Sequence, residues 1–385
     1  MSAGARIVAV MAGEEHADAV AAFYREVWDP AATTESVIVA NHQAAAANVA
    51  EPGVPPPTAI VLQGSRVIGY CSSIPQRLWD GRAERPAYWV KGLMVLPEFR
   101  NGPIGFLTVK ELSRHLTCST ILTVAPGAKR LFGALGYTDL GAVTNWVRPL
   151  RAGVIANRLD LNALGLGSLP TWVGSGIGIA RRTGLASLGA SLGGLALDAA
   201  VSAARFGSRR FATEVAMPNG NELDELWNAS RVEMTASPVR DSMYLLNRFG
   251  PTSPEGDAYT FVAARERGRL AGVAVVRKPK ATSDPRLGGI RVATIADIVY
   301  RPTQRDAGLA TLGAIERLAR AERADALVCM SSNPALTAVL RRQGYLSLRG
   351  NVHFFIRDVT GANTWPPDRA SWWLGRGDGE SDATF

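Results

Sequence analysis

Two short stretches of the chain combine an arginine with small residues at a spacing that suits phosphate binding. Each reads apolar-x-Pro-x-x-Arg-x-x-(Pro/Gly)-apolar-small, and the two, 95–105 and 300–310, lie 205 positions apart. Small residues let a backbone approach a ligand closely, and a helix N-terminus supplies unpaired amides and a partial positive charge. A strand-to-helix turn of this kind can hold a diphosphate, to which the arginine adds charge-assisted contacts.

The segments around these motifs repeat in the same order, which indicates two copies of one structural unit. Before each motif, alternating apolar residues and a Gly-containing turn predict a strand hairpin, at 58–75 and 259–279. After each motif, apolar residues at three and four spacing predict a helix, at 106–116 and 311–322. Each copy then continues through a strand (119–125, 325–331), a helix ending in Gly-Tyr (129–137, 336–345) and a closing strand (144–148, 352–357).

A length of 385 residues suits two domains, and the repeat sets their limits. We expect an N-terminal domain at 1–150, a Gly/Ala/Arg-rich helical linker at 151–212, a C-terminal domain at 213–358 and a tryptophan-containing acidic tail at 359–385. Tryptophans so close to a chain end usually cover a core.

The net charge of +8 is concentrated in the linker, where seven arginines face only two aspartates between Arg151 and Arg210. The flanking domains are close to balanced, which argues against a DNA-binding face. Three separated cysteines and four unclustered histidines indicate no metal site and a reducing, intracellular location, the cytoplasm. The chain contains no uninterrupted strongly apolar run of about 20 residues, the length a membrane-spanning helix requires.

At this level the sequence resembles the GNAT superfamily of acetyl-CoA-dependent N-acyltransferases. The stretches LMVLPEFRNGPIG and DIVYRPTQRDAGLA are similar to its acyl-CoA motif, in which the fourth strand ends in V-x-P-x-x-R-x-x-G-x-(G/A). The layout also looks like tandem GNAT proteins of bacterial polysaccharide biosynthesis. The resemblance implies an α/β fold (an α+β mixed sheet) in two tandem domains, each a mixed central sheet flanked by helices.

The resemblance also implies acetyl-CoA, or another acyl-CoA, as the cofactor, held by the loop amides and the end of the fourth strand. In the first copy the matching residues are Met94, Val95, Arg100, Asn101, Gly102, Ile104 and Gly105. In the second copy they are Val299, Tyr300, Arg305, Asp306, Ala307, Gly308, Leu309, Ala310 and Asn333. The second copy fits the consensus fully, whereas Pro103 replaces a glycine in the first and removes one N–H donor. Motif quality therefore favours the second copy as the cofactor site.

The two copies also differ where the family places its catalytic groups. Asp297 stands where an acidic residue takes the proton of the amine, and it is either that base or an edge-strand residue that faces solvent or pairs with an arginine; the first copy has Gly92 there. Leu340 and Phe132 fill the position of the usual tyrosine acid. Tyr137 and Tyr345 are expected to begin buried strands.

The expected function is transfer of an acetyl or short acyl group from CoA to the amine of a small molecule, such as an amino sugar. Two alternatives stay open: a non-catalytic acyl-CoA-binding scaffold or sensor, and an aminoacyl transferase whose donor is carried on RNA. A membrane surface is a further possible partner through the arginine-bearing linker. The protein is expected to be a monomer or a homodimer.

Overall fold

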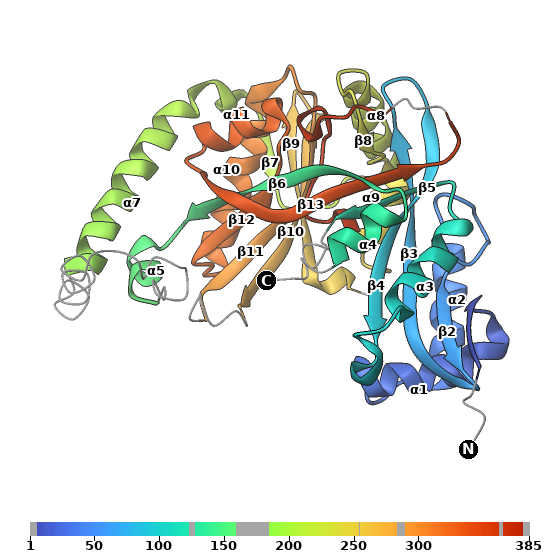
Figure 1. Cartoon of the computed structure of the whole chain (residues 1–385). Helices are drawn as coiled ribbons and strands as arrows, with labels where there is room; N and C mark the ends of the chain where they lie inside the picture. Colours follow the sequence, from blue (N-terminus) through green and yellow to red (C-terminus); the bar gives the residue numbers. More distant parts are fainter. Residues whose placement is uncertain are drawn as a thin grey trace. The chain divides into compact units, whose positions relative to one another are not determined.

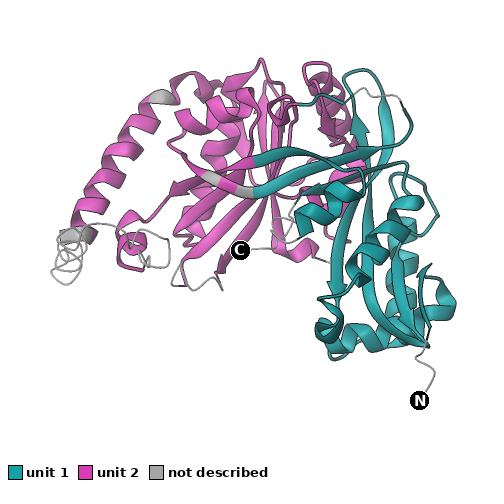
Figure 2. Ribbon diagram, viewed as in Figure 1, with its two compact units in different colours: residues 1–142, 351–367 teal, residues 143–350, 368–385 magenta. Residues whose placement is uncertain are grey.

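A computed structural model describes residues 6–122, 128–158, 185–253, 255–282, 289–361 and 365–379. The chain folds into two compact units, each assembled from two separate stretches of sequence (Figures 1 and 2). Unit 1 contains Met1–Ala142 and Asn351–Pro367, and unit 2 contains Val143–Gly350 and Asp368–Phe385. The mixed α/β class that the sequence predicts is confirmed, with a mixed sheet flanked by helices.

The sheet of unit 1 has the strand order β1-β2-β3-β4-β5-β13, and its neighbours are antiparallel apart from β4 and β5. Its strands are β1 (Ile7–Met11), β2 (Ala59–Gln63), β3 (Arg66–Trp79), β4 (Glu84–Val95), β5 (Cys118–Leu122) and β13 (Leu346–Asp358). Its helices are η1 (Glu14–His16), α1 (Ala17–Val27), α2 (Thr34–Ala46), η2 (Pro97–Phe99), α3 (Ile104–Arg114) and α4 (Lys129–Ala134).

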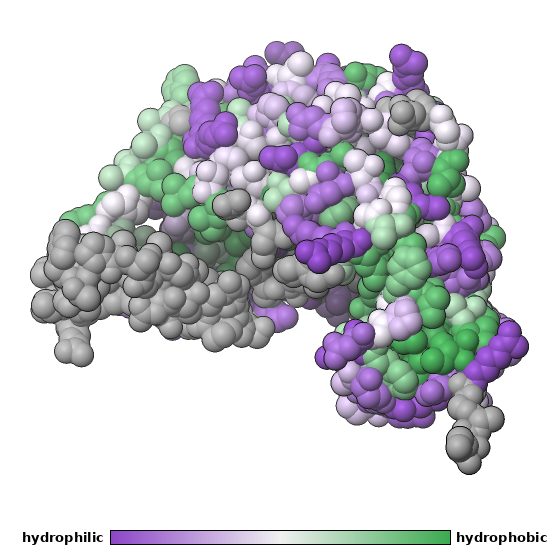
Figure 3. Space-filling view, in the orientation of Figure 1, coloured by the Kyte–Doolittle hydropathy of each residue, from purple (hydrophilic) through white to green (hydrophobic). Residues whose placement is uncertain are grey.

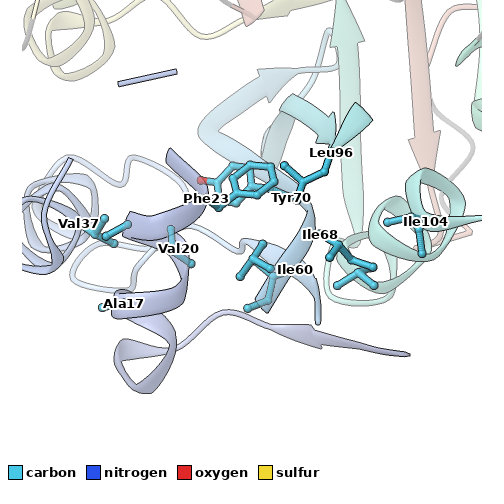
Figure 4. Packing of buried hydrophobic residues seen from close by; sticks show 12 residues of the cluster. Ala17, Val20, Phe23, Val37, Ile60, Ile68, Tyr70, Leu96 and Ile104 are labelled. Carbon is cyan, nitrogen blue, oxygen red and sulfur yellow. The ribbon is translucent and has the colours of Figure 1, made fainter. Parts of the chain in front are cut away.

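The core of unit 1 is built from the apolar stripes of its helices and the inward residues of its strands. Phe23 of α1, Ile60 of β2, Ile68 of β3 and Ile104 of α3 belong to one buried cluster (Figure 4). Leu96, directly after β4, is fully buried in the same cluster. Because Leu96 and Ile104 lie near the two ends of the first arginine motif, their burial fixes both ends of that loop.

Unit 2 repeats this architecture with the strand order β6-β12-β11-β10-β9-β7 and one parallel pair, β11 with β12. Its strands are β6 (Thr138–Pro149), β7 (Ala212–Glu214), β8 (Ser237–Pro238), β9 (Tyr259–Glu266), β10 (Arg269–Ala281), β11 (Arg291–Tyr300) and β12 (Ala326–Met330). Its helices are α5 (Ala152–Arg158), α7 (Leu185–Ala204), η5 (Phe206–Arg210), α8 (Gly220–Arg231), α9 (Ser242–Phe249), η6 (Gly256–Ala258), α10 (Arg305–Ala321), α11 (Pro334–Arg342) and η8 (Arg369–Ser371).

The closing strands are exchanged between the two sequence halves. The repeat suggests that 144–148 closes the first copy and 352–357 the second. In the structure, Asn145–Pro149 of β6 pairs with β12, and Phe354–Asp358 of β13 pairs with β5. Both strands carry similar apolar residues, so their sequences do not specify which sheet edge each completes.

Arginine side chains hold the exchanged strands in place. In unit 1, Nη1 of Arg357 donates to the carbonyl oxygens of Ser113 (2.9 Å) and Leu116 (3.2 Å). In unit 2, the fully buried Arg148 of β6 pairs with Asp198 and Glu316. Removing one partner of such a pair would leave an uncompensated buried charge, which makes the arrangement specific. Within the described residues, no helix is both long enough and apolar enough to cross a bilayer.

Candidate functional site

The first arginine motif forms an open corner between β4 and α3. The amide of Leu96 donates to the carbonyl of Ile68 at 3.1 Å, and the amide of Gly102 donates to the carbonyl of Phe99 at 3.1 Å, which shapes the turn. The helix starts at Ile104, and Pro103 at its N-cap makes no side-chain capping bond. The amides of the first helical turn therefore have neither an intrahelical acceptor nor a side-chain cap.

Arg100 and the glycines of this corner are placed around the same opening. Arg100 is exposed and folds back over the strand end, with Nε donating to the carbonyl of Val95 at 3.1 Å. A Cβ on Gly102 would meet nothing closer than a carbonyl oxygen at 3.4 Å. A Cβ on Gly105 would lie 3.7 Å from Val95 and from Leu131 of α4, so Gly105 sits where strand and both helices converge. This corner leaves room for a ligand to contact the backbone.

The strand that leads into the first corner separates from its parallel neighbour. Within the described residues, which end at Leu122 in β5, β4 pairs with β5 only at Tyr88 and Trp89. A register shift in the β3–β4 ladder and a φ of +63° at Gly92 mark a β-bulge just beyond. The residues that follow the bulge, Leu93, Met94 and Val95, are only partly buried. An open strand edge of this kind can offer backbone groups to an extended ligand.

The second corner has the same topology but a different packing. β11 pairs with β12 only as far as Thr294, and α10 begins at Arg305. A Cβ on Gly308 would come within 2.8 Å of the ring of Tyr300, so this glycine serves close helix–strand packing. The carboxylate of Glu233 accepts from the amide of Thr303 at 2.9 Å and from its hydroxyl at 2.8 Å. One of the loop amides is therefore already hydrogen-bonded to a carboxylate of the protein itself.

The C-terminal tail occupies the space where β11 and β12 separate. The indole of Trp373 donates to the carbonyl of Ile298 at 2.9 Å, and the amide of Gly377 donates to the carbonyl of Ala296 at 2.6 Å. The ring of Trp373 packs edge-on against Tyr300, with centroids 5.2 Å apart. Trp372, Trp373 and Leu374 are fully buried. The tail thus takes up backbone acceptors of β11 that β12 leaves unpaired.

Asp297 lies beneath this tail in a buried ion-pair cluster. Arg240 donates from Nε to Oδ1 of Asp297 at 2.7 Å and from Nη2 to Asp378 of the tail at 2.8 Å. Burial raises the pKa of Asp297 to about 6, against the lowering effect of Arg240. The second oxygen, Oδ2, has no partner among the residues that the structure describes. Of the two roles that the sequence left open, this geometry supports the arginine pair.

The other residues that the sequence proposes for cofactor binding differ in their exposure to solvent. At the first corner, Asn101 and Gly102 are exposed and Ile104 is buried. At the second, Arg305 is exposed, and Asp306 lies 3.9 Å from Arg210. The remaining candidates there are buried: Val299, Tyr300, Ala307, Gly308, Leu309 and Ala310.

The positions that would supply a family asparagine or acid are occupied by structural residues. Asn333 is the N-cap of α11, where its Oδ1 accepts from the amide of Ala335, while its Nδ2 donates to the tail carbonyl of Ala370 at 3.3 Å. Tyr137 is buried, and its hydroxyl bonds to Ser113 and Ser119. Tyr345 is buried as well. Ala125, which stands in the first copy where Asn333 stands in the second, lies outside the described residues.

Two groups near the first corner have no signature in the sequence. Tyr24 of α1 and Trp28, the residue that caps the C-terminal end of α1, pack against Tyr70 of β3, and the Tyr24 and Tyr70 hydroxyls lie 2.6 Å apart. A Cβ at Gly92 would lie 3.8 Å from both Trp28 and Tyr70, so these aromatics adjoin the bulge. Contacts between residues about 50 positions apart leave no periodic signal.

The second group is a chain of polar contacts beside α4. Nζ of Lys129 lies 2.6 Å from Nε2 of His353, and Nδ1 of His353 lies 2.9 Å from Asp139. Lysine carries only donors, so Nε2 accepts and Nδ1–H donates to the carboxylate, which defines the tautomer. His353 reaches this place through the strand exchange.

Metal and thiol chemistry find no support in the described part of the chain. It contains no group of three or more His, Cys, Asp or Glu side chains arranged to hold a metal ion. The three cysteines are free and buried, and burial raises the pKa of the Cys118 thiol to about 12. A buried thiol with a raised pKa is a poor nucleophile.

Comparison with solved structures identifies the fold. The chain adopts the fold of the GCN5-related N-acetyltransferases. It superposes on such an enzyme from Anabaena variabilis with a TM-score of 0.55 and 13% identity, covering 92% of this chain and 73% of that one. A probable N-acyltransferase from Enterococcus faecalis gives a TM-score of 0.54 at 10% identity, with the same coverage.

Another class of enzyme shares this fold. Saccharomyces cerevisiae N-myristoyltransferase with bound myristoyl-CoA superposes with a TM-score of 0.52 and 11% identity, covering 91% of this chain and 82% of that one. No protein-family model matches the chain, and no curated protein matches its sequence. At these identities the likeness defines the fold, and the resemblance seen in the sequence is confirmed at that level.

Proposed function

We propose that the chain is an acyltransferase that binds acyl-CoA, with acetyl-CoA as the first candidate, at the corner between β4 and α3 of unit 1. One contrast carries the proposal. Leu93 to Val95 and the loop from Asn101 to Pro103 are accessible, whereas the tail and Glu233 already occupy the equivalent backbone of unit 2. A pantetheine arm needs an open strand edge, and its diphosphate needs unoccupied amides. Motif quality favours the second copy, but packing favours the first.

Each part of this corner would have a distinct role. The first-turn amides of α3 and the exposed guanidinium of Arg100 would hold the diphosphate through charge-assisted hydrogen bonds. Gly102 and Gly105 would let it approach the backbone. Backbone N–H groups of β4 beyond Gly92 would polarise the thioester carbonyl, because no neighbouring strand of unit 1 pairs with that edge in the described residues.

The reaction is direct transfer to an amine. The amine nitrogen attacks the thioester carbon, the C–S bond breaks, and the proton of the amine passes to the CoA sulfur directly or through water. Residue 92 is a glycine, so β4 offers no carboxylate base at that position. Positioning of the two reactants would then supply much of the acceleration. We place the amine near Tyr24, Trp28 and Tyr70, which adjoin the bulge.

Calorimetric titration with acetyl-CoA tests the binding step. We expect Arg100→Ala to weaken binding at least about tenfold, the value of one charge-assisted hydrogen bond, and Arg305→Ala to bind like the wild type. Both arginines are exposed and occupy equivalent motif positions, so each variant controls for the other. Absence of wild-type binding, or weakening in Arg305→Ala alone, would refute the assignment.

Release of free CoA with a panel of small amines tests catalysis separately. Turnover that saturates with one amine class and is lost in Arg100→Ala supports the transferase. The absence of a carboxylate at residue 92 also suits a non-catalytic acyl-CoA sensor. Tight binding without turnover of any amine would select that function instead.

A further inference from the structure

A cavity of about 360 Å³ lies in unit 2 on the side of α10 that faces η5 and β7. Its floor contains Leu309, Ala310 and Gly313 of α10 together with the buried Ser208 and Phe211. Three arginines and no carboxylate line it: Arg205, Arg209 and Arg317. The cavity is separate from the first arginine corner, since all of its lining residues belong to unit 2.

Two of these arginines carry charge that the described protein does not neutralise. The guanidinium of Arg317 donates to the hydroxyl of Thr213 at 2.8 Å, and Arg209 lies over the ring of Phe206 at 5.1 Å. Neither forms an ion pair with any carboxylate in the described ranges. Several other arginines of unit 2 do, including Arg265 and Arg301. Uncompensated guanidinium groups around a concave surface attract an anion.

The third arginine is held rigidly at the wall of the cavity. Nε of Arg205 donates to Oε1 of Gln343 at 2.8 Å, and Nη2 pairs with Glu316. A Cβ on Gly313 would lie only 3.4 Å from Cζ of Arg205, so the guanidinium rests on the backbone of α10. Glu316 neutralises this arginine, but its planar group remains in a fixed position. A preorganised arginine loses less entropy when it binds a ligand.

We infer that this cavity binds a phosphate-bearing anion, a phosphomonoester or a diphosphate. The planar forks of Arg209 and Arg317 match the geometry of phosphate oxygens. The hydroxyl of Thr213 accepts from Arg317 and keeps its own hydrogen free to donate to the same anion. A second cavity of unit 2 provides the contrast, because its wall mixes Glu222, Glu225 and Glu266 with its arginines. The carboxylates of that second cavity would repel the anion that the arginine-lined cavity attracts.

The phosphate can belong to a soluble compound or to a lipid headgroup. Phe206, beside Arg209, is 74% exposed, and three leucines of α7 (Leu188, Leu192 and Leu195) are 59–65% exposed. Hydrophobic surface appears along α7 (Figure 3). Exposed apolar side chains next to basic ones suit an anionic bilayer, whereas the cavity alone suits a soluble ligand. The experiment therefore needs one arm for each source.

The first arm is a calorimetric titration with inorganic pyrophosphate, performed on the wild type and on three variants. Arg209→Gln/Arg317→Gln should weaken binding at least about tenfold. Arg342→Gln, which removes an exposed arginine on α11, should bind like the wild type. Arg100→Ala separates this cavity from the acyl-CoA corner and should retain the site. Equal weakening in Arg342→Gln, or no pyrophosphate binding by the wild type, would overturn the inference.

The second arm is flotation with vesicles that contain phosphatidylglycerol, in the presence and absence of pyrophosphate. Vesicle binding that pyrophosphate displaces, and that the double variant lacks, assigns the site to lipid headgroups. Pyrophosphate binding without flotation assigns it to a soluble phosphorylated ligand. Flotation that the double variant retains, with no pyrophosphate binding, would show that the cavity holds no phosphate.

Discussion

The indole Nε1 of Trp373 donates a hydrogen bond of 2.9 Å to the carbonyl oxygen of Ile298. This bond ties the C-terminal tail to the strand that would receive a pantetheine arm in the second copy. Two similar sequence motifs thus lie in two different environments, one accessible and one covered by the chain itself. The difference yields predictions about stability, catalysis and pH dependence.

Trp373 should stabilise unit 2 through both its ring and its N–H. We expect Trp373→Ala to lower the free energy of unfolding by about 3–5 kcal/mol, as for other buried aromatics. Trp373→Phe should lower it by about 1–3 kcal/mol, because it leaves a buried carbonyl without a donor. Urea unfolding measures both, with Trp28→Phe as the control at a site 44% exposed. Unchanged stability in Trp373→Ala would contradict the packing of the tail.

Asp297 should affect catalysis little if it serves as a partner of Arg240. The carboxamide of Asp297→Asn can still accept from Arg240, so we expect kcat/KM to stay within about threefold of the wild type. Loss of a general base typically lowers the rate by about 10²–10⁴-fold. A stable Asp297→Asn variant with such a loss would restore the base hypothesis.

Removal of the arginine in the same cluster should have a much larger effect. Arg240→Gln leaves two buried carboxylates, Asp297 and Asp378, without their counter-charge. Such a loss typically costs about 3–5 kcal/mol of stability. The unfolding free energies of Arg240→Gln and Asp297→Asn, measured side by side at pH 7, should therefore differ strongly. Equal unfolding free energies for the two variants would show that Arg240 does not stabilise the two carboxylates.

The same cluster should make stability depend on pH. The folded-state pKa of Asp297 is raised from 3.8 to about 6, so the folded state binds more protons than the unfolded state between these values. The contribution of this group to stability is therefore full below about pH 4 and declines as the pH rises through 6. Unfolding measured from pH 4 to pH 7 should show this decline in the wild type and a smaller one in Asp297→Asn. Parallel curves would contradict it.

Two motif glycines should respond in opposite ways to a larger side chain. In Gly308→Ala the new methyl would meet the ring of Tyr300 at 2.8 Å, so we expect a loss of about 1–3 kcal/mol in stability and unchanged acetyl-CoA affinity. In Gly105→Val the first side-chain carbon has ordinary contacts at 3.7 Å, so we expect a smaller loss of stability, while a side chain larger than the alanine that the motif accepts obstructs the diphosphate. Urea unfolding and acetyl-CoA titration of both variants check this. The reverse pattern would place the cofactor at the second corner.

Local sequence patterns predicted the architecture of both halves. Each strand-to-helix corner formed where its motif stands, because Pro97 and Pro302 end the strands and the following apolar periodicity specifies a helix. The alternating segments at 58–75 and 259–279 became the hairpins β2–β3 and β9–β10. These hairpins and corners depend on residues that are neighbours in sequence, and so a single sequence is enough to predict them.

The environment of each corner was a matter of tertiary structure. Nothing near Ile298 in the sequence indicates that a tryptophan 75 positions later covers it, and Arg240 meets Asp297 from 57 positions away. The partner of each closing strand was equally hidden, since β6 and β13 have the same alternation and either could complete either sheet. Such contacts depend on which surfaces remain uncovered once the units have formed. The sequence alone therefore predicted two candidate phosphate-binding motifs, and only the folded chain decided which of them stayed open.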